Sequence, residues 1–71
     1  MFTLRDLYNA TSASQKVVLY VTETPGTKPV TYTPHGNTPI KMIDVDERLY
    51  NFVVDFVQAC KDMILEIHIE E

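Results

Sequence analysis

The last third of the chain, NFVVDFVQACKDMILEIHIEE (residues 51–71), constrains the fold most. It forms either a long helix followed by a strand or two strands in a hairpin. The helical interpretation rests on apolar residues at helical spacing from Val45 to Cys60, with Asp44 and Glu47 resembling a helix cap. The hairpin interpretation rests on the β-branched and aromatic run NFVVDFV and on the alternating run MILEIHI.

The connection between the two runs favours the hairpin. Only Lys61 and Asp62 separate them, and neither is a residue type that ends a helix. Two residues join antiparallel strands more readily than a helix and a strand. We therefore predict paired strands at residues 52–59 and 63–69, after one or two helical turns in DVDERLY. The alternation in the second strand places Met63, Leu65, Ile67 and Ile69 inward and Glu66 and His68 outward.

The start of the chain predicts a short helix. Thr3 is a suitable N-cap, and Asp6 lies three residues later, where its carboxylate reaches back to the cap. Leu4, Leu7 and Tyr8 then share one face. So short a helix is not stable alone and must pack on the rest of the domain.

Two further strands are expected before the middle of the chain. KVVLYVT (residues 16–22) is apolar on both faces, which indicates a central strand or one covered by the helix. Pro25 and Gly26 suit the two central positions of a type II turn. PVTYTP (residues 29–34) alternates, and its flanking prolines place it at a sheet edge.

Together these elements predict a single α+β domain spanning residues 1–71. A short N-terminal helix packs on a four-stranded antiparallel sheet of two hairpins, strongly twisted or barrel-like. A chain of this size buries only about 60% of the surface that its unfolded form exposes, so we expect a homodimer or higher oligomer, paired through an edge of the terminal hairpin. The predicted core contains Leu19, Val54, Phe56, Leu65 and Ile67.

Composition limits the function. The net charge is −4 and the pI about 4.9, which argues against nucleic-acid binding and fits a basic protein surface as the partner. One cysteine cannot form an internal disulfide, and the start MFTLRDLYNA lacks the features of a secretory signal. We therefore expect a cytoplasmic protein. No apolar run approaches the roughly 18 residues of a membrane span, so no membrane contact is expected.

The order of LRDL, KVVLY, IKMID, a valine-rich segment, KD and ILEIHI resembles short uncharacterised proteins encoded by phages and prophages of Gram-positive bacteria. Those proteins have a start of LKDLL type, a KIEIYD-like strand and a terminal hairpin turning on two acidic residues. The segment TETPGTKPVTYTPHGN departs from this pattern because it is richer in Thr and Pro. The resemblance implies a phage accessory protein in the cytoplasm of a host bacterium, a class that includes inhibitors of host defence systems.

No motif indicates catalysis. DVDE (residues 44–47) resembles the start of a calcium loop, but Leu49 stands where the loop needs glycine. His35 and His68 lack partners at metal-ligand spacing, and Cys60 lacks the surroundings that activate a thiol. We therefore expect no enzyme, no cofactor and no metal.

The sequence favours a non-catalytic protein-binding module that inhibits a host factor or defence system. The candidate partner-binding residues are acidic and lie beside Arg5 or in DVDE, although such acids are more often simply solvated: Asp6, Asp44, Asp46 and Glu47. The alternative is a small-molecule or nucleotide binder, a sponge formed at an oligomer interface. Its tyrosines would stack on a base and its cations meet phosphate, with Lys28, Lys41, Arg48 and Tyr32 as contacts.

Overall fold

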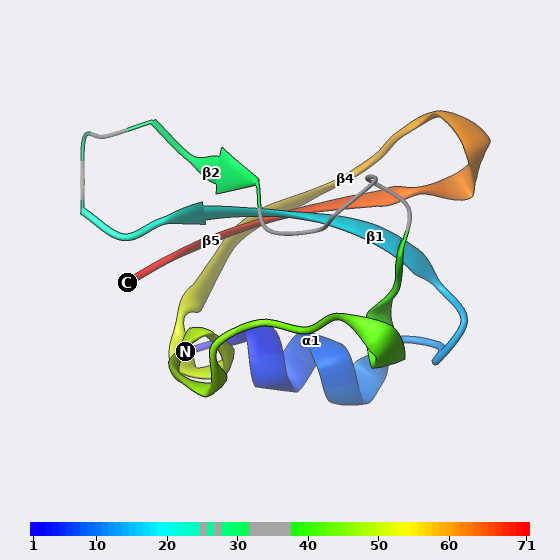
Figure 1. Ribbon diagram of the computed structural model, residues 1–71, viewed down its shortest axis with the longest axis horizontal. Helices are drawn as coiled ribbons and strands as arrows, with labels where there is room; N and C mark the ends of the chain where they lie inside the picture. The colour runs from blue at the N-terminus through cyan, green and yellow to red at the C-terminus, as the bar shows by residue number, and fades with distance from the viewer. Residues whose placement is uncertain (25, 27, 32–37) are drawn as a thin grey trace.

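The computed structural model describes residues 1–24, 26, 28–31 and 38–71. The chain belongs to the α+β class, with one N-terminal helix and a mixed sheet (Figure 1). The helix and the 3₁₀ segments at residues 40–42 and 47–51 lie on one side of the sheet (Figure 1). The helix and strands are α1 (Leu4–Ala10), β1 (Lys16–Thr22), β2 (Val30–Thr31), β3 (Thr38–Pro39), β4 (Val53–Ala59) and β5 (Leu65–Glu70). The 3₁₀ segments are η2 (Ile40–Met42), η3 (Glu47–Asn51) and η4 (Lys61–Met63).

The C-terminal third forms the predicted hairpin. Strands β4 and β5 are antiparallel and pair from Val53 opposite Glu70 to Ala59 opposite Leu65. A β-bulge at Asp55 shifts the register between Val54 and Phe56. The helical interpretation of residues 45–60 is therefore wrong, and the helical turns within this range are confined to η3.

The predicted four-stranded antiparallel sheet, strongly twisted or barrel-like, differs from the observed five-stranded sheet in strand count and in one pairing. Strand β1 is central, as expected, but it pairs with β5 in parallel, with Leu19 beside Ile67 and Val21 beside Ile69. The strand order is β2-β1-β5-β4, β3 also pairs with β1, and the sheet does not close. Apolar alternation places the same side chains on the core face in either strand direction, so the sequence pattern alone could not distinguish the two.

The N-terminal helix has the predicted cap. The Asp6 backbone N–H donates to Thr3 Oγ1 at 3.4 Å, and the Thr3 backbone N–H donates to the Asp6 carboxylate at 2.9 Å. The cap of η3 differs from the prediction, because Asp46 rather than Asp44 accepts from the Arg48 N–H at 3.1 Å. These local bonds satisfy backbone donors that a short helix cannot satisfy internally.

The hydrophobic core lies between the sheet and the helical layer. Leu19 and Ile67 are buried as predicted, whereas Val54 and Leu65 are only partly buried. Phe56 was expected in the core but is 46% exposed, because the bulge places it on the opposite face of the sheet beside His68. The buried residues are Leu4, Val17, Leu19, Val21, Ile40, Leu49, Phe52, Ile67 and Ile69.

The β4–β5 turn contains an unusual backbone. Asp62 and Met63 both have φ of 61°, and the Ile64 N–H donates to the Lys61 carbonyl at 3.3 Å. Met63 was expected to point inward as part of the second strand, but it lies in this turn and is 88% exposed. Two successive positive φ values match a type I′ turn, the type that fits the twist of a hairpin.

The middle hairpin is described only in part. Strand β2 pairs antiparallel with β1, as the sequence predicts, and Thr31 lies opposite Tyr20. Gly26 has φ of 87°, as the second central residue of a type II turn requires. The remaining predictions for this region, Pro25 in the turn and residues 32–34 in the strand, lie outside the described residues.

Candidate functional site

Two tyrosines from distant parts of the chain meet on the helical side of the molecule. Tyr8 is in α1 and Tyr50 is in η3, and their rings form an edge-to-face pair with centroids 5.6 Å apart. Both residues pack partly against the hydrophobic core. Such a pair presents a rigid amphipathic surface: the apolar rings are held by the core, and the hydroxyls are polar.

Cations flank both rings. Lys41 Nζ lies 3.6 Å from the Tyr8 ring centroid and also donates to the Tyr8 backbone carbonyl at 3.1 Å. The Arg5 guanidinium lies 5.2 Å from the Tyr50 centroid and donates to Glu47 at 3.1 Å. Cation–π contacts at these distances hold the rings and the charged side chains in fixed relative positions.

The Tyr50 hydroxyl remains protonated at neutral pH. Burial is the main cause that raises its pKa, and the neighbouring Tyr8, Glu47 and Asp44 raise it further. The hydroxyl therefore remains able to donate a hydrogen bond. We define the tyrosine face as Tyr8, Tyr50, Arg5, Lys41, Asp44 and Glu47.

The four predicted partner-binding acids have different roles. Asp44 and Glu47 belong to the tyrosine face, and Glu47 pairs with Arg5. Asp6 is held in the α1 capping box, and its hydrogen bonds with Thr3 lower the pKa of its carboxyl. Asp46 caps η3 and contacts Arg48 Nε at 3.4 Å. Two of the expected acids are therefore paired with cations, Glu47 with Arg5 and Asp46 with Arg48.

The described residues among the alternative ligand contacts have different surroundings. Lys41 is on Tyr8, whereas Arg48 donates to Glu23 at 2.5 Å, and this bond is the main cause that raises the pKa of Arg48. Lys28 is exposed in the connection between β1 and β2. Tyr32 lies outside the described residues.

The other face of the sheet carries a row of stacked rings. His68 in β5 stacks on Phe56 of β4 at 4.0 Å and on Tyr20 of β1 at 4.7 Å, with interplanar angles of 17° and 12°. His68 points outward as predicted, but the two neighbouring rings reduce its side-chain exposure to 18%. Because Phe56 and Tyr20 stack on the His68 ring, no base can stack on it.

One carboxylate links the only cysteine to this row. Glu66 contacts His68 Nε2 at 2.6 Å and accepts from Cys60 Sγ at 3.1 Å. The bond to Glu66 raises the pKa of the Cys60 thiol, whereas the bonds from His68 and Cys60 lower the pKa of Glu66. Since the acid stands between the thiol and the imidazole, the thiol is kept protonated, the opposite of what a nucleophile requires.

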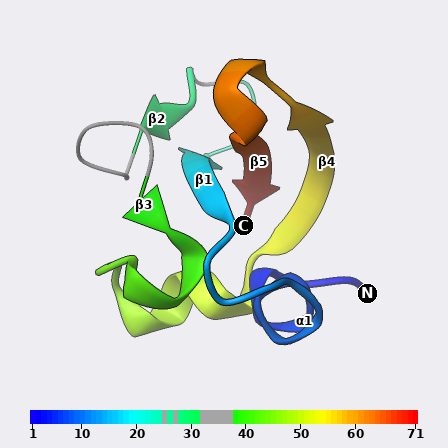
Figure 2. The ribbon, with the colours of Figure 1, turned by 90° about the vertical axis from the view of Figure 1, so that its right-hand side faces the viewer.

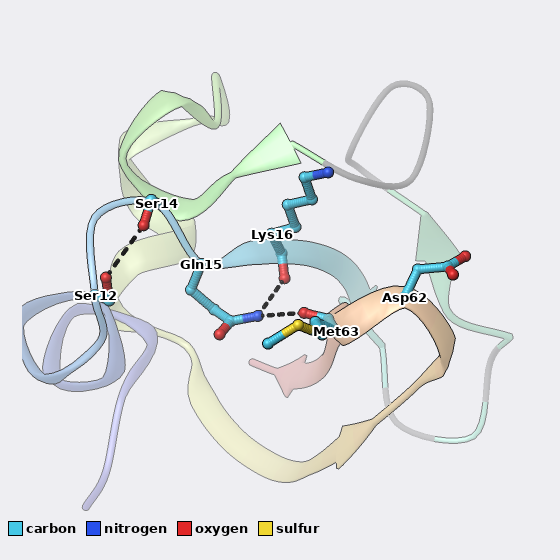
Figure 3. A pocket seen from close by; sticks show the side chains of 6 residues that line it. All are labelled: Ser12, Ser14, Gln15, Lys16, Asp62 and Met63. Atoms are coloured by element: carbon cyan, nitrogen blue, oxygen red, sulfur yellow. Dashed lines mark hydrogen bonds between the residues drawn. The ribbon is translucent and has the colours of Figure 1, made fainter.

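A shallow pocket of about 290 Å³ lies where the helix–β1 connection meets the β4–β5 turn (Figure 3). Gln15 Nε2 donates to the Met63 carbonyl at 2.8 Å and to the Lys16 carbonyl at 2.9 Å. The side chains of Lys16 and Asp62 point in different directions at its rim (Figure 3). The side-chain amide of Gln15 therefore holds the β4–β5 turn in place and is not available to a ligand. The pocket marks a contact between two segments of the chain.

Within the described part of the chain, no three His, Cys, Asp or Glu side chains are placed to hold a metal ion together. No helix among the described residues is long and apolar enough to cross a membrane.

Sequence reasoning missed the Tyr8–Tyr50 pair, because the two residues are 42 positions apart and no local pattern connects them. The available signal was weaker: each tyrosine lies in a predicted helical turn, two residues after a charged residue, Asp6 before Tyr8 and Arg48 before Tyr50. Comparisons with protein families, with curated proteins and with solved structures give no match to this chain.

Proposed function

We propose that this chain is a non-catalytic protein-binding module that holds its partner on the tyrosine face. The observation that carries the proposal is the Tyr8–Tyr50 pair, fixed against the core and flanked by Lys41 and Arg5. Tyrosine and arginine are enriched among residues that dominate binding energy at protein interfaces, and a preorganised anchor loses little conformational entropy on binding.

The charge of the molecule supports a basic partner. A net charge of −4 attracts a positively charged protein surface and raises the rate of encounter. Asp44 and Glu47 stand at the rim of the tyrosine face, where charges act mainly through steering. In this proposal the tyrosines supply most of the affinity, and the acids supply the association rate.

The biological setting follows from the sequence resemblance. We place the protein in the cytoplasm of a host bacterium, as a phage or prophage accessory protein that blocks a host factor or defence system. The protonated state of the Cys60 thiol agrees with a role that needs no covalent chemistry. The nucleotide-sponge alternative has less support, because Lys41 and Arg48 already contact groups of the protein itself.

Affinity capture from a lysate of a Gram-positive host tests the proposal. Wild type should retain a specific protein, and Arg5→Glu should lose it, because a glutamate beside Glu47 repels and removes the cation on Tyr50. Lys28→Glu is the matched control, since it makes the same charge change at an exposed position outside the tyrosine face. Both variants make the chain more negative, which by itself favours a basic partner, so equal loss in both would contradict binding through this face. If wild type retains nothing specific, the proposal fails.

A further inference from the structure

Strand β4 is the last strand of the sheet, and its outer edge is only partly covered (Figure 2). The N-terminal segment covers the start of this edge: Val54 N–H donates to the Phe2 carbonyl at 2.8 Å, and Leu4 N–H donates to the Phe52 carbonyl at 3.0 Å. Beyond Val54, no described residue pairs with this edge. Residues 55–59 are all exposed.

The direction of the main-chain groups along β4 follows from its end. The Cys60 N–H donates to the Ile64 carbonyl at 2.8 Å, so the main chain of Cys60 faces β5. Main-chain groups alternate in direction along a strand, so those of Gln58 and Phe56 also face β5. The amides and carbonyls of Val57 and Ala59 therefore point away from the sheet. Such groups are a template for an added strand.

We infer that the strand added at this edge is β4 of a second copy of the chain. The two strands run antiparallel about a two-fold axis at Val57, which exchanges both main-chain hydrogen bonds with Val57 of the second copy. Asp55 then stands opposite Ala59 of that copy. Pairing centred on Phe56 would set Val57 opposite Asp55 of the second copy, where the bulge interrupts the alternation of the main-chain groups. Pairing centred beyond Val57 would run into the turn at Lys61 and Asp62.

The side chains of β4 suit this register. Phe56, 46% exposed, stands opposite Gln58 of the second copy and diagonal to its Phe56, a separation that aromatic side chains span. Asp55 is the only charged residue in VVDFVQA. It stands opposite Ala59 of the second copy, and Lys61 of that copy follows two residues after Ala59. A molecule of net charge −4 therefore meets its copy along this strand without placing like charges opposite one another. The pairing uses no residue of the tyrosine face, so it is independent of the proposed function.

Light scattering of the intact chain between micromolar and submillimolar concentration tests the inference. Wild type should reach twice the monomer mass of 8.2 kDa. Val57→Lys and Val57→Glu should each be monomeric, because like charges then face each other across the axis. An equimolar mixture of the two variants should again form dimers. Val30→Lys and Val30→Glu are matched controls at an exposed valine in β2, and they should dimerise as wild type does.

Disulfide trapping defines the register. In a Cys60→Ser chain, Val57→Cys should cross-link on oxidation, since directly opposed residues have Cα atoms about 5.5 Å apart, within disulfide range. Val30→Cys in the same chain should not. A wild-type chain that stays monomeric overturns the inference. So does a Val57 charge variant that still dimerises alone, or a Val57→Cys chain that links no faster than the Val30→Cys control.

Discussion

Met63 is a residue in a conformation that its side chain disfavours. Its φ is 61°, and its side chain is 88% exposed, so it gains little burial for that strain. A non-glycine residue in this region costs about 1–3 kcal/mol, whereas glycine adopts it freely. We expect Met63→Gly to raise the free energy of unfolding by about 1 kcal/mol after the extra chain entropy of glycine is subtracted. Urea denaturation measures this.

The control for that prediction is Met42→Gly, at a methionine that is 72% exposed in η2 without a positive φ. This change should lower the free energy of unfolding, because only the entropy cost of glycine remains. If both variants are destabilised to the same extent, the backbone of the β4–β5 turn is not strained at Met63.

The Cys60 thiol is exposed, but we expect it to react slowly, because its hydrogen bond to Glu66 raises its pKa. At mildly alkaline pH the thiolate fraction is therefore small, and alkylation by iodoacetamide should be slower than for an unperturbed thiol. Glu66→Gln should speed alkylation, since the neutral amide no longer disfavours the thiolate. In denaturing urea the two chains should react at the same rate. Faster alkylation of wild type than of Glu66→Gln would contradict the contact.

At the scale of elements, helix α1 depends on its cap. The hydrogen bonds from Thr3 lower the pKa of Asp6 below its ordinary value, so the folded state binds that proton less tightly than the unfolded state does. The bonded carboxylate therefore stabilises the fold at neutral pH, and this contribution is lost as pH falls below about 4. Asp6→Ala should melt below wild type at neutral pH, and the difference should shrink as pH is lowered through this range.

Comparing the two chains isolates Asp6, because Glu66, whose pKa is also lowered, titrates in both and cancels in the difference. Differential scanning calorimetry across pH measures the effect. A difference in melting temperature that stays constant down to strongly acidic pH would show that the Asp6 carboxylate does not stabilise the cap through its charge.

The elements that were predicted correctly are those set by near neighbours in the sequence. The α1 capping box spans four residues, and the β4–β5 hairpin is set by two adjacent strands and a short turn. The bulge at Asp55 was not predictable, because it depends on how two strands align after they pair. It is the reason that Phe56 lies beside His68 instead of in the core.

At the scale of the whole molecule, the features that could not be predicted from the sequence depend on contacts between distant segments. β1 and β5 are separated by more than forty residues, and both are apolar on alternate positions, so their relative direction had no sequence signal. The tyrosine face has the same origin, because it forms only when α1 and η3 pack together. Its individual residues were visible in the sequence, but their juxtaposition was not.

The parallel pairing of β1 with β5 is the central claim, because it leaves β4 as the free edge and puts α1, η2 and η3 over one face. Methyl and amide NOEs between the two strands test it directly. The structure predicts contacts of Val17 with Leu65 and of Val21 with Ile69, so partners advance together along both strands. Contacts of Val17 with Ile69 and of Val21 with Leu65 would show an antiparallel pair and contradict the account.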